Sequence, residues 1–177
     1  MTRPLLSVAS KNLGFIVVGL ALLVITVGLG YHWMLGNSTP DVEFTTIKGD
    51  HIRLGDLQGY PVLITFWASD CRPCLEEIPD LVELHRQYSE RGFKLISVAM
   101  AYDIPSRVVT LAEAQPLPYA VALDPLGSIA AAFKGVNGVP NSFLIAPNGR
   151  IALHILGRIS IDDLRERIRS MLPETKM

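Results

Sequence analysis

Residues 61–79 read PVLITFWASDCRPCLEEIP and join an apolar run to a pair of cysteines. The run at residues 61–67 is unbroken and rich in β-forming residues, which is typical of a buried strand. After Cys71, apolar residues recur with the helical period of about 3.6 until Gly92 ends the pattern. The sequence therefore predicts that Cys71 and Cys74 form a C-x-x-C pair where a helix begins, just after a buried strand.

The position of the cysteine pair predicts redox chemistry. At a helix N-terminus, a Cys71 thiolate faces unpaired backbone N–H groups and the positive end of the helix dipole, which lower its pKa. Arg72 adds a positive charge nearby, and Cys74, one turn further along, is expected to attack the mixed disulfide. We expect no metal, but a purely structural bridge and a zinc site remain open. Zinc would need two further ligands from His51, His85 and His154.

Further patterns predict the rest of one α/β domain. Strands are expected at residues 93–100, 119–123, 142–146 and 151–156. The Pro-Asn-Gly turn at residues 147–149 joins the last two strands into a hairpin. Helices are expected at about residues 106–114, 128–133 and 160–172, and a capping box of Ser160 and Asp163 opens the last. The alternation of strands and helices favours an α/β sheet that ends in a hairpin.

The N-terminal segment predicts a membrane anchor. Residues 13–30 read LGFIVVGLALLVITVGLG, with Thr26 as the one polar side chain. At about 1.5 Å per residue, a helix that continues to residue 35 crosses a hydrocarbon core of about 30 Å. Arg3 and Lys11 precede it with no acid among them, which favours a cytoplasmic N-terminus and a periplasmic domain at the bacterial inner membrane.

We therefore expect a cytoplasmic segment at residues 1–12, an anchor at 13–35, a linker at 36–40 and one domain at 41–177. A cleaved signal peptide remains the alternative, although the apolar run is longer than a secretory h-region.

The string FWASDCRPCLEEIP at residues 66–79 resembles the signature F-W-A-x-W-C-x-P-C-x-x-E-x-P of the TlpA/ResA/CcmG group, which are membrane-anchored thioredoxin-like proteins. The resemblance covers most of residues 41–172 and includes GVNGVP at residues 135–140. It implies a thioredoxin fold, in which helices flank a central mixed β-sheet, with the TlpA-type central insertion at about residues 102–132.

The resemblance also implies roles for residues outside the cysteine pair. Pro140 takes the place of the group's cis-proline, which would expose the backbone of Val139 for pairing with an extended substrate. Glu77 matches the group's acid and would relay a proton to Cys74 or tune the thiol pKa values. Its alternative is an exposed first-turn acid that the helix dipole stabilises. Substrate contacts are expected from Trp67, Asp70, Arg72, Pro73, Val139 and Asn141.

Three residues depart from the group's pattern. Asp70 stands where the group usually has Trp, which removes an aromatic ring from the recognition surface and puts a negative charge beside Cys71. Asn141 replaces the hydroxyl residue that normally follows the cis-proline. Thr65 stands where thioredoxin has a buried Asp, so Glu77 gains importance as a proton carrier.

The expected function is a periplasmic protein-disulfide reductase that needs no cofactor. Its substrates would be disulfide-bearing extracytoplasmic proteins, such as apocytochrome c or metal-site assembly proteins. The resemblance implies a membrane thiol transporter of the DsbD/CcdA type as the electron donor. The net charge of −1 gives no indication of nucleic-acid binding.

Two other functions stay open. A thiol peroxidase would share the fold, but its P-x-x-x-T-x-x-C pattern here has Ala68 in place of the cysteine. A copper-binding or chaperone module would use the cysteine pair as soft ligands, with Met100 or His85 in addition.

Overall fold

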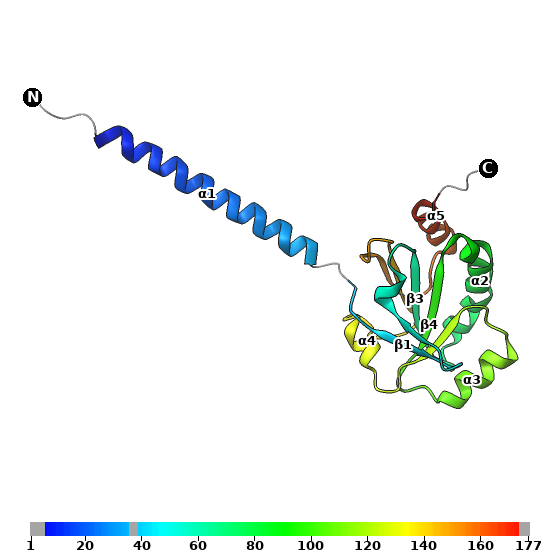
Figure 1. Ribbon diagram of the computed structural model, residues 1–177. Coiled ribbons are helices and arrows are strands. Elements are labelled where there is room, and N and C mark those ends of the chain that lie inside the picture. The colour runs from blue at the N-terminus through cyan, green and yellow to red at the C-terminus, as the bar shows by residue number, and fades with distance from the viewer. Residues whose placement is uncertain (1–5, 36–38, 174–177) are drawn as a thin grey trace, which may run out of the picture. The chain divides into compact units, whose positions relative to one another are not determined.

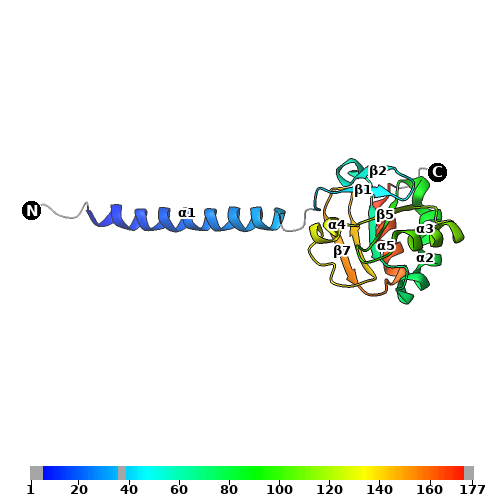
Figure 2. The same cartoon turned by 90° about the horizontal axis from the view of Figure 1, so that it is seen from below.

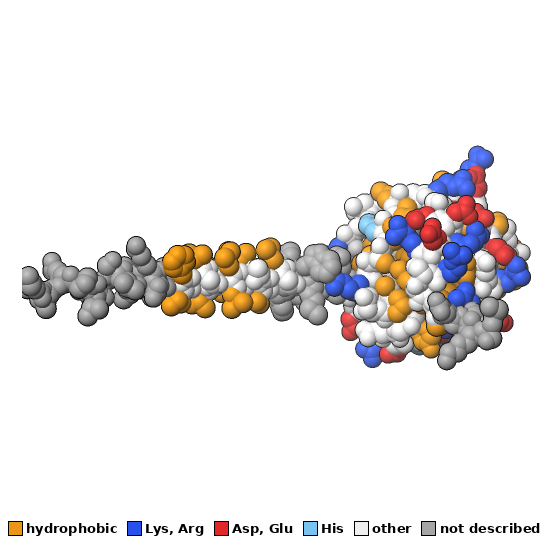
Figure 3. Space-filling model, turned by 90° about the horizontal axis from the view of Figure 1, so that it is seen from above, with side chains coloured by type: hydrophobic (Ala, Val, Ile, Leu, Met, Phe, Trp, Pro, Cys, Tyr) orange, Lys and Arg blue, Asp and Glu red, His pale blue; other side chains and the backbone are white. Residues whose placement is uncertain are grey.

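The computed structural model describes residues 6–35 and 39–173, and the chain divides into two units, Met1–Ser38 and Thr39–Met177. Helix α1 (Leu6–Leu35) forms the first unit. On the face that Figure 3 shows, the described side chains of α1 are mainly hydrophobic, which matches the sequence.

Within the described ranges, no helix is both long and apolar enough to cross a membrane. The anchor at residues 13–35 therefore stays a prediction. Residues 1–5 and 36–38, which belong to the expected cytoplasmic segment and linker, lie outside the described residues.

The second unit is built on a seven-stranded sheet with the order β2-β1-β5-β4-β3-β6-β7. Its strands are β1 (Glu43–Thr46), β2 (His51–Arg53), β3 (Val62–Trp67), β4 (Lys94–Ala99), β5 (Ala120–Leu123), β6 (Asn141–Ile145) and β7 (Ile151–Leu156). Strands β3, β4 and β5 run parallel to one another, and the other neighbouring pairs are antiparallel. This mixed sheet and its flanking helices confirm the predicted α/β class.

Helices cover both faces of the sheet (Figures 1 and 2). They are α2 (Arg72–Tyr88), α3 (Pro105–Ala114), α4 (Ser128–Ala132) and α5 (Ile161–Met171), with short 3-10 turns at η1 (Leu54–Leu57) and η2 (Ser89–Arg91). Buried side chains of α2, α3 and α5 form one core cluster, and those of α4 and η1 form the other. The sheet therefore separates two apolar layers.

Strand β3 is buried on both faces, which explains its unbroken apolar sequence. Leu63 and Trp67 pack in the cluster with α2, whereas Ile64 and Phe66 pack in the cluster with α4. Successive strand residues point to opposite faces, and each large side chain that is fully buried contributes roughly 1.5–3 kcal/mol. Because β3 is held from both sides, its carboxyl end gives the cysteine pair a rigid support.

The expected helices and strands are present, within a few residues of their predicted ends. The expected insertion at residues 102–132 holds α3, β5 and α4, and β5 joins the sheet between β1 and β4. The antiparallel pair β1 and β2 was not predicted. Its strands have four and three residues, and β1 buries only every second side chain, so the apolar signal is too short to find.

The predicted capping box of α5 is wrong. Ser160 occupies the N-cap position, but its side chain makes no capping hydrogen bond. The carboxylate of Asp163 instead accepts hydrogen bonds from Nε of Arg167, one turn further along the helix, at 3.0 and 3.1 Å. An i, i+4 ion pair has therefore replaced the reciprocal cap.

Candidate active site

Cys71 and Cys74 are joined by a disulfide across the first turn of α2, and their Cα atoms lie 5.3 Å apart. Cys71 is the N-cap residue, with an extended backbone at φ −84° and ψ 97°. Its Sγ accepts a hydrogen bond from the backbone N of Cys74 at 3.3 Å. Pro73 lacks an N–H but lies in the first turn, where helix donors have no partner within the helix. The chain therefore places the Cys71 sulfur against the N-terminus of α2, as predicted.

The two sulfurs differ in their access to other molecules. Cys71 is half-buried, whereas Cys74 is only 4% exposed and belongs to the core cluster that contains α2. A protein disulfide can approach the outer sulfur but not the inner one. When the pair is reduced, the N-terminal N–H groups of α2 stabilise a thiolate on Cys71.

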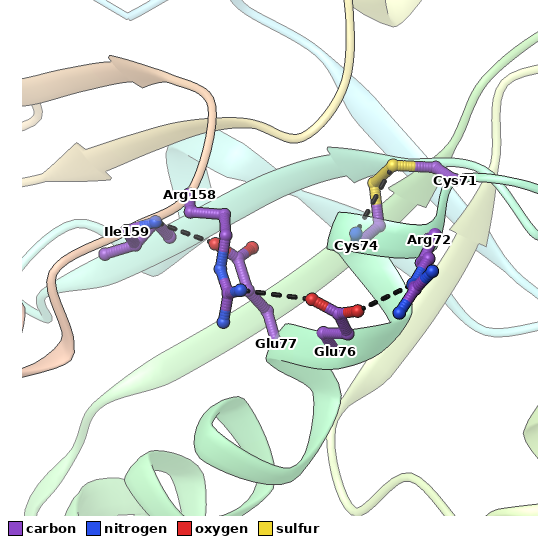
Figure 4. Close-up of polar contacts among 7 residues, drawn as sticks. All are labelled: Cys71, Arg72, Cys74, Glu76, Glu77, Arg158 and Ile159. Carbon is purple, nitrogen blue, oxygen red and sulfur yellow. Dashed lines mark hydrogen bonds and ion pairs between the residues drawn. A yellow bond between two sulfur atoms is a disulfide. The ribbon is translucent and has the colours of Figure 1, made fainter.

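Glu77, one turn beyond Cys74, is 2% exposed. Its Oε1 accepts a hydrogen bond from the backbone N of Ile159 at 2.7 Å (Figure 4). Burial raises the pKa of this carboxyl group, and it outweighs the Ile159 hydrogen bond and the charge of Arg158, which lower the pKa. The alternative of an exposed first-turn acid does not fit this position.

A chain of ion pairs runs beside the cysteines on the surface of α2 (Figure 4). The carboxylate of Glu76 binds Nε of Arg72 at 2.9 Å and a terminal guanidinium nitrogen of Arg158 at 3.1 Å. Exposed pairs of this kind contribute little stability. They do connect the first turn of α2 to the segment that binds Glu77, and they partly compensate the positive charge of Arg72.

Cys74 and Glu77 line the same small cavity, of about 10 Å³, together with Tyr119 and Thr65. Burial raises the pKa of the Tyr119 hydroxyl, so it stays protonated. Thr65 Oγ1 accepts a hydrogen bond from Ser142 Oγ at 2.9 Å. Among the residues that line the cavity, Glu77 carries the carboxyl group, so it is the side chain placed to exchange a proton with Cys74.

The loop before β6 lies beside the cysteine pair. The peptide bond between Val139 and Pro140 is cis, as predicted. Asn141 follows directly and pairs with Phe66 in the antiparallel ladder of β3 and β6, close to where β3 leads into the C-x-x-C segment. Val139 and Cys71 are both partly buried and pack against the same core cluster.

The predicted substrate contacts fall into two groups. Asp70, Arg72 and Pro73 are exposed next to Cys71, and Val139 is half-buried. Trp67 is only 5% exposed and packs into the core below the site, so its predicted substrate contact stays a prediction that its burial does not favour.

The side chain of Asn141 is fully buried, so its predicted substrate contact likewise stays a prediction that its burial does not favour. Its Nδ2 donates to the carbonyl of Gly135 at 2.9 Å, and its Oδ1 lies 2.8 Å from Nε2 of His154. The amide therefore supports the loop at residues 135–140 from within.

Three residues at the site were missed by the sequence prediction: Asp103, Arg158 and Ile159. Arg158 and Ile159 lie 82 residues from their partners on α2, and no local pattern marks them. Asp103 follows buried strand β4, whose parallel pairing with β3 brings its carboxyl end to the same edge of the sheet. A polar residue in the loop that follows a buried parallel strand often lies at a functional site, and this pattern in the sequence could have identified Asp103.

The histidines considered for zinc are engaged elsewhere. His85 packs edge-on against Tyr119, His154 stacks on Phe143, and His51 pairs with Glu43 at 3.0 Å. Within the part of the chain that the structure describes, no group of three or more His, Cys, Asp or Glu side chains is placed to hold a metal ion.

A disulfide at the N-terminus of a helix, an inner sulfur beside a buried acid, and a cis-proline loop define a dithiol-disulfide exchange site on a thioredoxin-type sheet. The chain belongs to the AhpC/TSA family, whose pattern matches residues 35–154. Within this family it is a thiol-disulfide oxidoreductase of the ResA type, with the pair Cys71 and Cys74.

Individual relatives support this assignment. The chain is 31% identical over 139 residues to the thiol-disulfide oxidoreductase ResA of Bacillus thuringiensis subsp. konkukian, which covers 78% of this chain and 79% of that protein. It is 29% identical over 139 residues to ResA of Geobacillus thermodenitrificans, with the same coverage. A thiol:disulfide interchange protein of the thioredoxin family from Chlorobium tepidum has a similar structure, with a TM-score of 0.70 and 26% identity over 76% of this chain and 95% of that one.

Proposed function

We propose that this thiol-disulfide oxidoreductase reduces disulfides in extracytoplasmic proteins while an N-terminal helix holds it at the bacterial inner membrane. The observation that carries the proposal is the pairing of an accessible sulfur, Cys71, with an inner sulfur, Cys74, that shares a cavity with a buried acid. Such an arrangement separates attack on the substrate from its release.

The reaction has two exchanges. In the reduced protein, the thiolate of Cys71 attacks one sulfur of the substrate disulfide, so the substrate S–S bond breaks and its other sulfur leaves as a thiolate that takes up a proton. Cys74 then loses its proton and attacks Cys71, which closes the protein disulfide and releases the second substrate thiol. Two electrons and two protons pass to the substrate, and the protein ends in the oxidised state seen here.

Glu77 serves the second exchange. Cys74 is buried and must become a thiolate before it can attack, so its proton needs an acceptor inside the protein. A carboxyl group with a raised pKa, lining the same cavity, is suited to take that proton near neutral pH and to release it later.

The surface around Cys71 would receive an extended polypeptide. Backbone groups of Val139 would pair with the substrate chain, as in strand addition, while Asp70, Arg72 and Pro73 contact residues next to its cysteine. Apocytochrome c and metal-site assembly proteins fit this description, because their cysteines must be reduced before they bind haem or metal.

Each turnover leaves Cys71 and Cys74 oxidised, so an external dithiol must reduce them. We propose a membrane thiol transporter of the DsbD/CcdA type as this donor. An anchor at residues 13–35 would keep the domain close to such a partner and to membrane-bound substrates.

The alternatives have less support. In the peroxidase pattern, the reactive cysteine would replace Ala68, which has no sulfur and is fully buried at the end of β3. A copper module would need a further ligand beside the cysteine pair, but His85, one candidate, packs against Tyr119.

The direction of electron flow is tested by the reduction potential. Equilibration with dithiothreitol and glutathione buffers should give a value near thioredoxin's, about −270 mV, and far from DsbA's, about −120 mV. A negative charge on Asp70 beside Cys71 opposes the extremely acidic thiolate of a strong oxidant. A potential above about −150 mV would make the protein an oxidant and contradict the reductase proposal.

Substrates and topology are tested in cells. A Cys74→Ser variant cannot close the protein disulfide, so it should accumulate mixed disulfides with its substrates at Cys71. Mass spectrometry should identify extracytoplasmic proteins among them, and a Cys71→Ser, Cys74→Ser double variant serves as the control. The full-length chain should remain in the membrane fraction with its domain protected from protease in intact cells. A soluble form beginning near residue 31 would instead show that the apolar run is a cleaved signal.

A further inference from the structure

The loop after β4 is fastened to the segment that leads into Cys71. The carboxylate of Asp103 accepts hydrogen bonds from the backbone N of Ser69 at 2.6 Å and from Ser69 Oγ at 2.7 Å. It also accepts one from the backbone N of Ile104 at 2.8 Å. Bonds to an ionised acceptor are stronger than neutral ones. The loop is therefore held in a fixed position at Ser69, one residue before Asp70 and two before Cys71.

This loop presents apolar side chains to solvent. Tyr102 is 62% exposed and Ile104 is 47% exposed. Leu126, in the loop after β5, is 88% exposed, and the two loops are neighbours because a Cβ on Gly127 would lie 3.6 Å from that of Ala101. Of the five large apolar side chains that are exposed in the described part of the domain, three lie on these two loops. Exposed apolar side chains on neighbouring loops are candidates for contact with a partner.

The position of the loop relative to the cysteine pair follows from the sheet. Strand β3 lies between β4 and β6. Strands β3 and β4 are parallel, so both end at the edge that holds Cys71, and antiparallel β6 begins at that edge. The loop that carries Tyr102 and the loop that carries Val139 therefore flank the cysteine pair on opposite sides.

The nature of residue 70 bears on the role of Tyr102. The signature that residues 66–79 resemble has Trp at the position of Asp70, so this chain lacks that aromatic ring in its C-x-x-C segment. The charge of Asp70 reaches the Tyr102 hydroxyl: burial is the main cause that raises the pKa of Tyr102, and Asp70 and Asp103 raise it further. A different segment of the chain thus brings an aromatic ring near Asp70, the residue that precedes Cys71.

We infer that Tyr102 and Ile104 form a specificity-determining contact that binds an apolar side chain next to the substrate cysteine. The inference rests on the proposed function and specifies its substrate class. Tyrosine offers a large apolar ring with one polar end, and few rotatable bonds are fixed when it is buried against a partner. The preferred substrates are extended polypeptides with an aromatic or aliphatic residue beside the disulfide, and the side of the site that holds Val139 pairs with their backbone.

The test compares two synthetic peptides, each with one internal disulfide, that differ only in Phe or Ser beside the reacting cysteine. The reduced full-length protein in detergent should reduce the Phe peptide about tenfold faster, which is within the range for burial of one aromatic side chain. Tyr102→Ala should lower this ratio to about twofold or less, and Tyr102→Phe should keep it. Ile104→Ser should lower it as well, which gives a second variant that removes no aromatic ring.

Tyr60 provides a matched control. It is 46% exposed and precedes β3 at the end away from the cysteines, so Tyr60→Ala should leave the peptide ratio unchanged. Reduction of oxidised glutathione, which is too small to reach the loop, should be equal in all variants. Failure of the wild-type protein to reduce either kind of disulfide would contradict the proposed function. Normal reduction with the same Phe to Ser ratio in wild type and Tyr102→Ala would overturn the inference about the loop.

Discussion

Replacement of Glu77 by glutamine should separate the two steps of the exchange reaction. Glutamine has nearly the same shape as glutamate, and its Oε1 can still accept the 2.7 Å hydrogen bond from the backbone of Ile159. The change therefore removes one titratable group from the cavity beside Cys74 and leaves the packing in place. Any change in the reaction rate then reports on proton transfer between Glu77 and Cys74.

The size of the effect follows from the helix geometry. Side chains three residues apart on a helix have Cβ atoms about 5–6 Å apart. At an effective dielectric constant of about 20, two negative charges at that separation repel by about 3 kcal/mol, or about two pKa units. A Glu77 carboxylate and a Cys74 thiolate therefore disfavour each other, so the two groups should titrate as a coupled pair in the reduced protein.

The loss of this coupling in Glu77→Gln should change both the titration of Cys74 and the rate of disulfide closure. In the reduced wild-type protein, Cys74 and Glu77 should titrate in two coupled steps, whereas Glu77→Gln should show one step. At about pH 6, closure of the protein disulfide should be about tenfold slower in the variant, which is less than the usual contribution of about 10²–10⁴-fold from general acid–base catalysis because a thiol is itself acidic. The difference should shrink at higher pH, where Cys74 ionises without help.

Stopped-flow measurement of mixed-disulfide decay, together with pH-dependent alkylation followed by mass spectrometry, provides both readouts. Glu83→Gln is the control, because Glu83 is an exposed acid on the same helix that pairs with Arg86. Identical titrations and identical rates for Glu77→Gln and the wild type would refute the proton-transfer role and leave Glu77 as a structural group.

Four further outcomes are expected. Alkylation of the reduced protein at mildly acidic pH should modify Cys71 first, because it is half-buried at the helix N-terminus while Cys74 is 4% exposed; preferential modification of Cys74 would reverse their roles. Arg158→Gln should raise the pKa of Glu77 further and move the pH profile of the rate to higher pH, and an unmoved profile would exclude this coupling. Folding raises the pKa of Glu77 above 4.5, so at pH values just above 4.5 the folded state binds more protons than the unfolded state. Glu77 therefore makes the free energy of unfolding of the wild type fall as the pH rises through this range. Urea unfolding of Glu77→Gln at several pH values should lack this contribution to the pH dependence. Leu84→Ala, at a fully buried position of α2, should lower the free energy of unfolding by about 2–5 kcal/mol, and a loss below about 1 kcal/mol would show that α2 is not packed as described.

Much of this protein is encoded in short stretches of its sequence. The apolar run of β3, the cysteine spacing and the period of α2 are local patterns, because a buried strand and an amphipathic helix each impose their own repeat. The hairpin of β6 and β7 follows from its turn residues, and the cis bond before Pro140 followed from resemblance to a known group. The redox role of Cys71 and Cys74 could be predicted for the same reason, because the C-x-x-C motif spans only four residues and its place at the start of a helix is a local feature.

The tertiary structure decided which side chains surround that pair. Ile159 reaches Glu77 across 82 residues, and Asp103 reaches Ser69 across 34, and such contacts depend on strand order and helix packing. Burial is likewise a property of the whole fold, so residue type and spacing could not show that Trp67 and Asn141 are enclosed while Tyr102 is exposed. A local pattern specifies an element because its hydrogen bonds and its apolar face are local. The environment of a proton or a substrate is set by whichever distant segments pack against it.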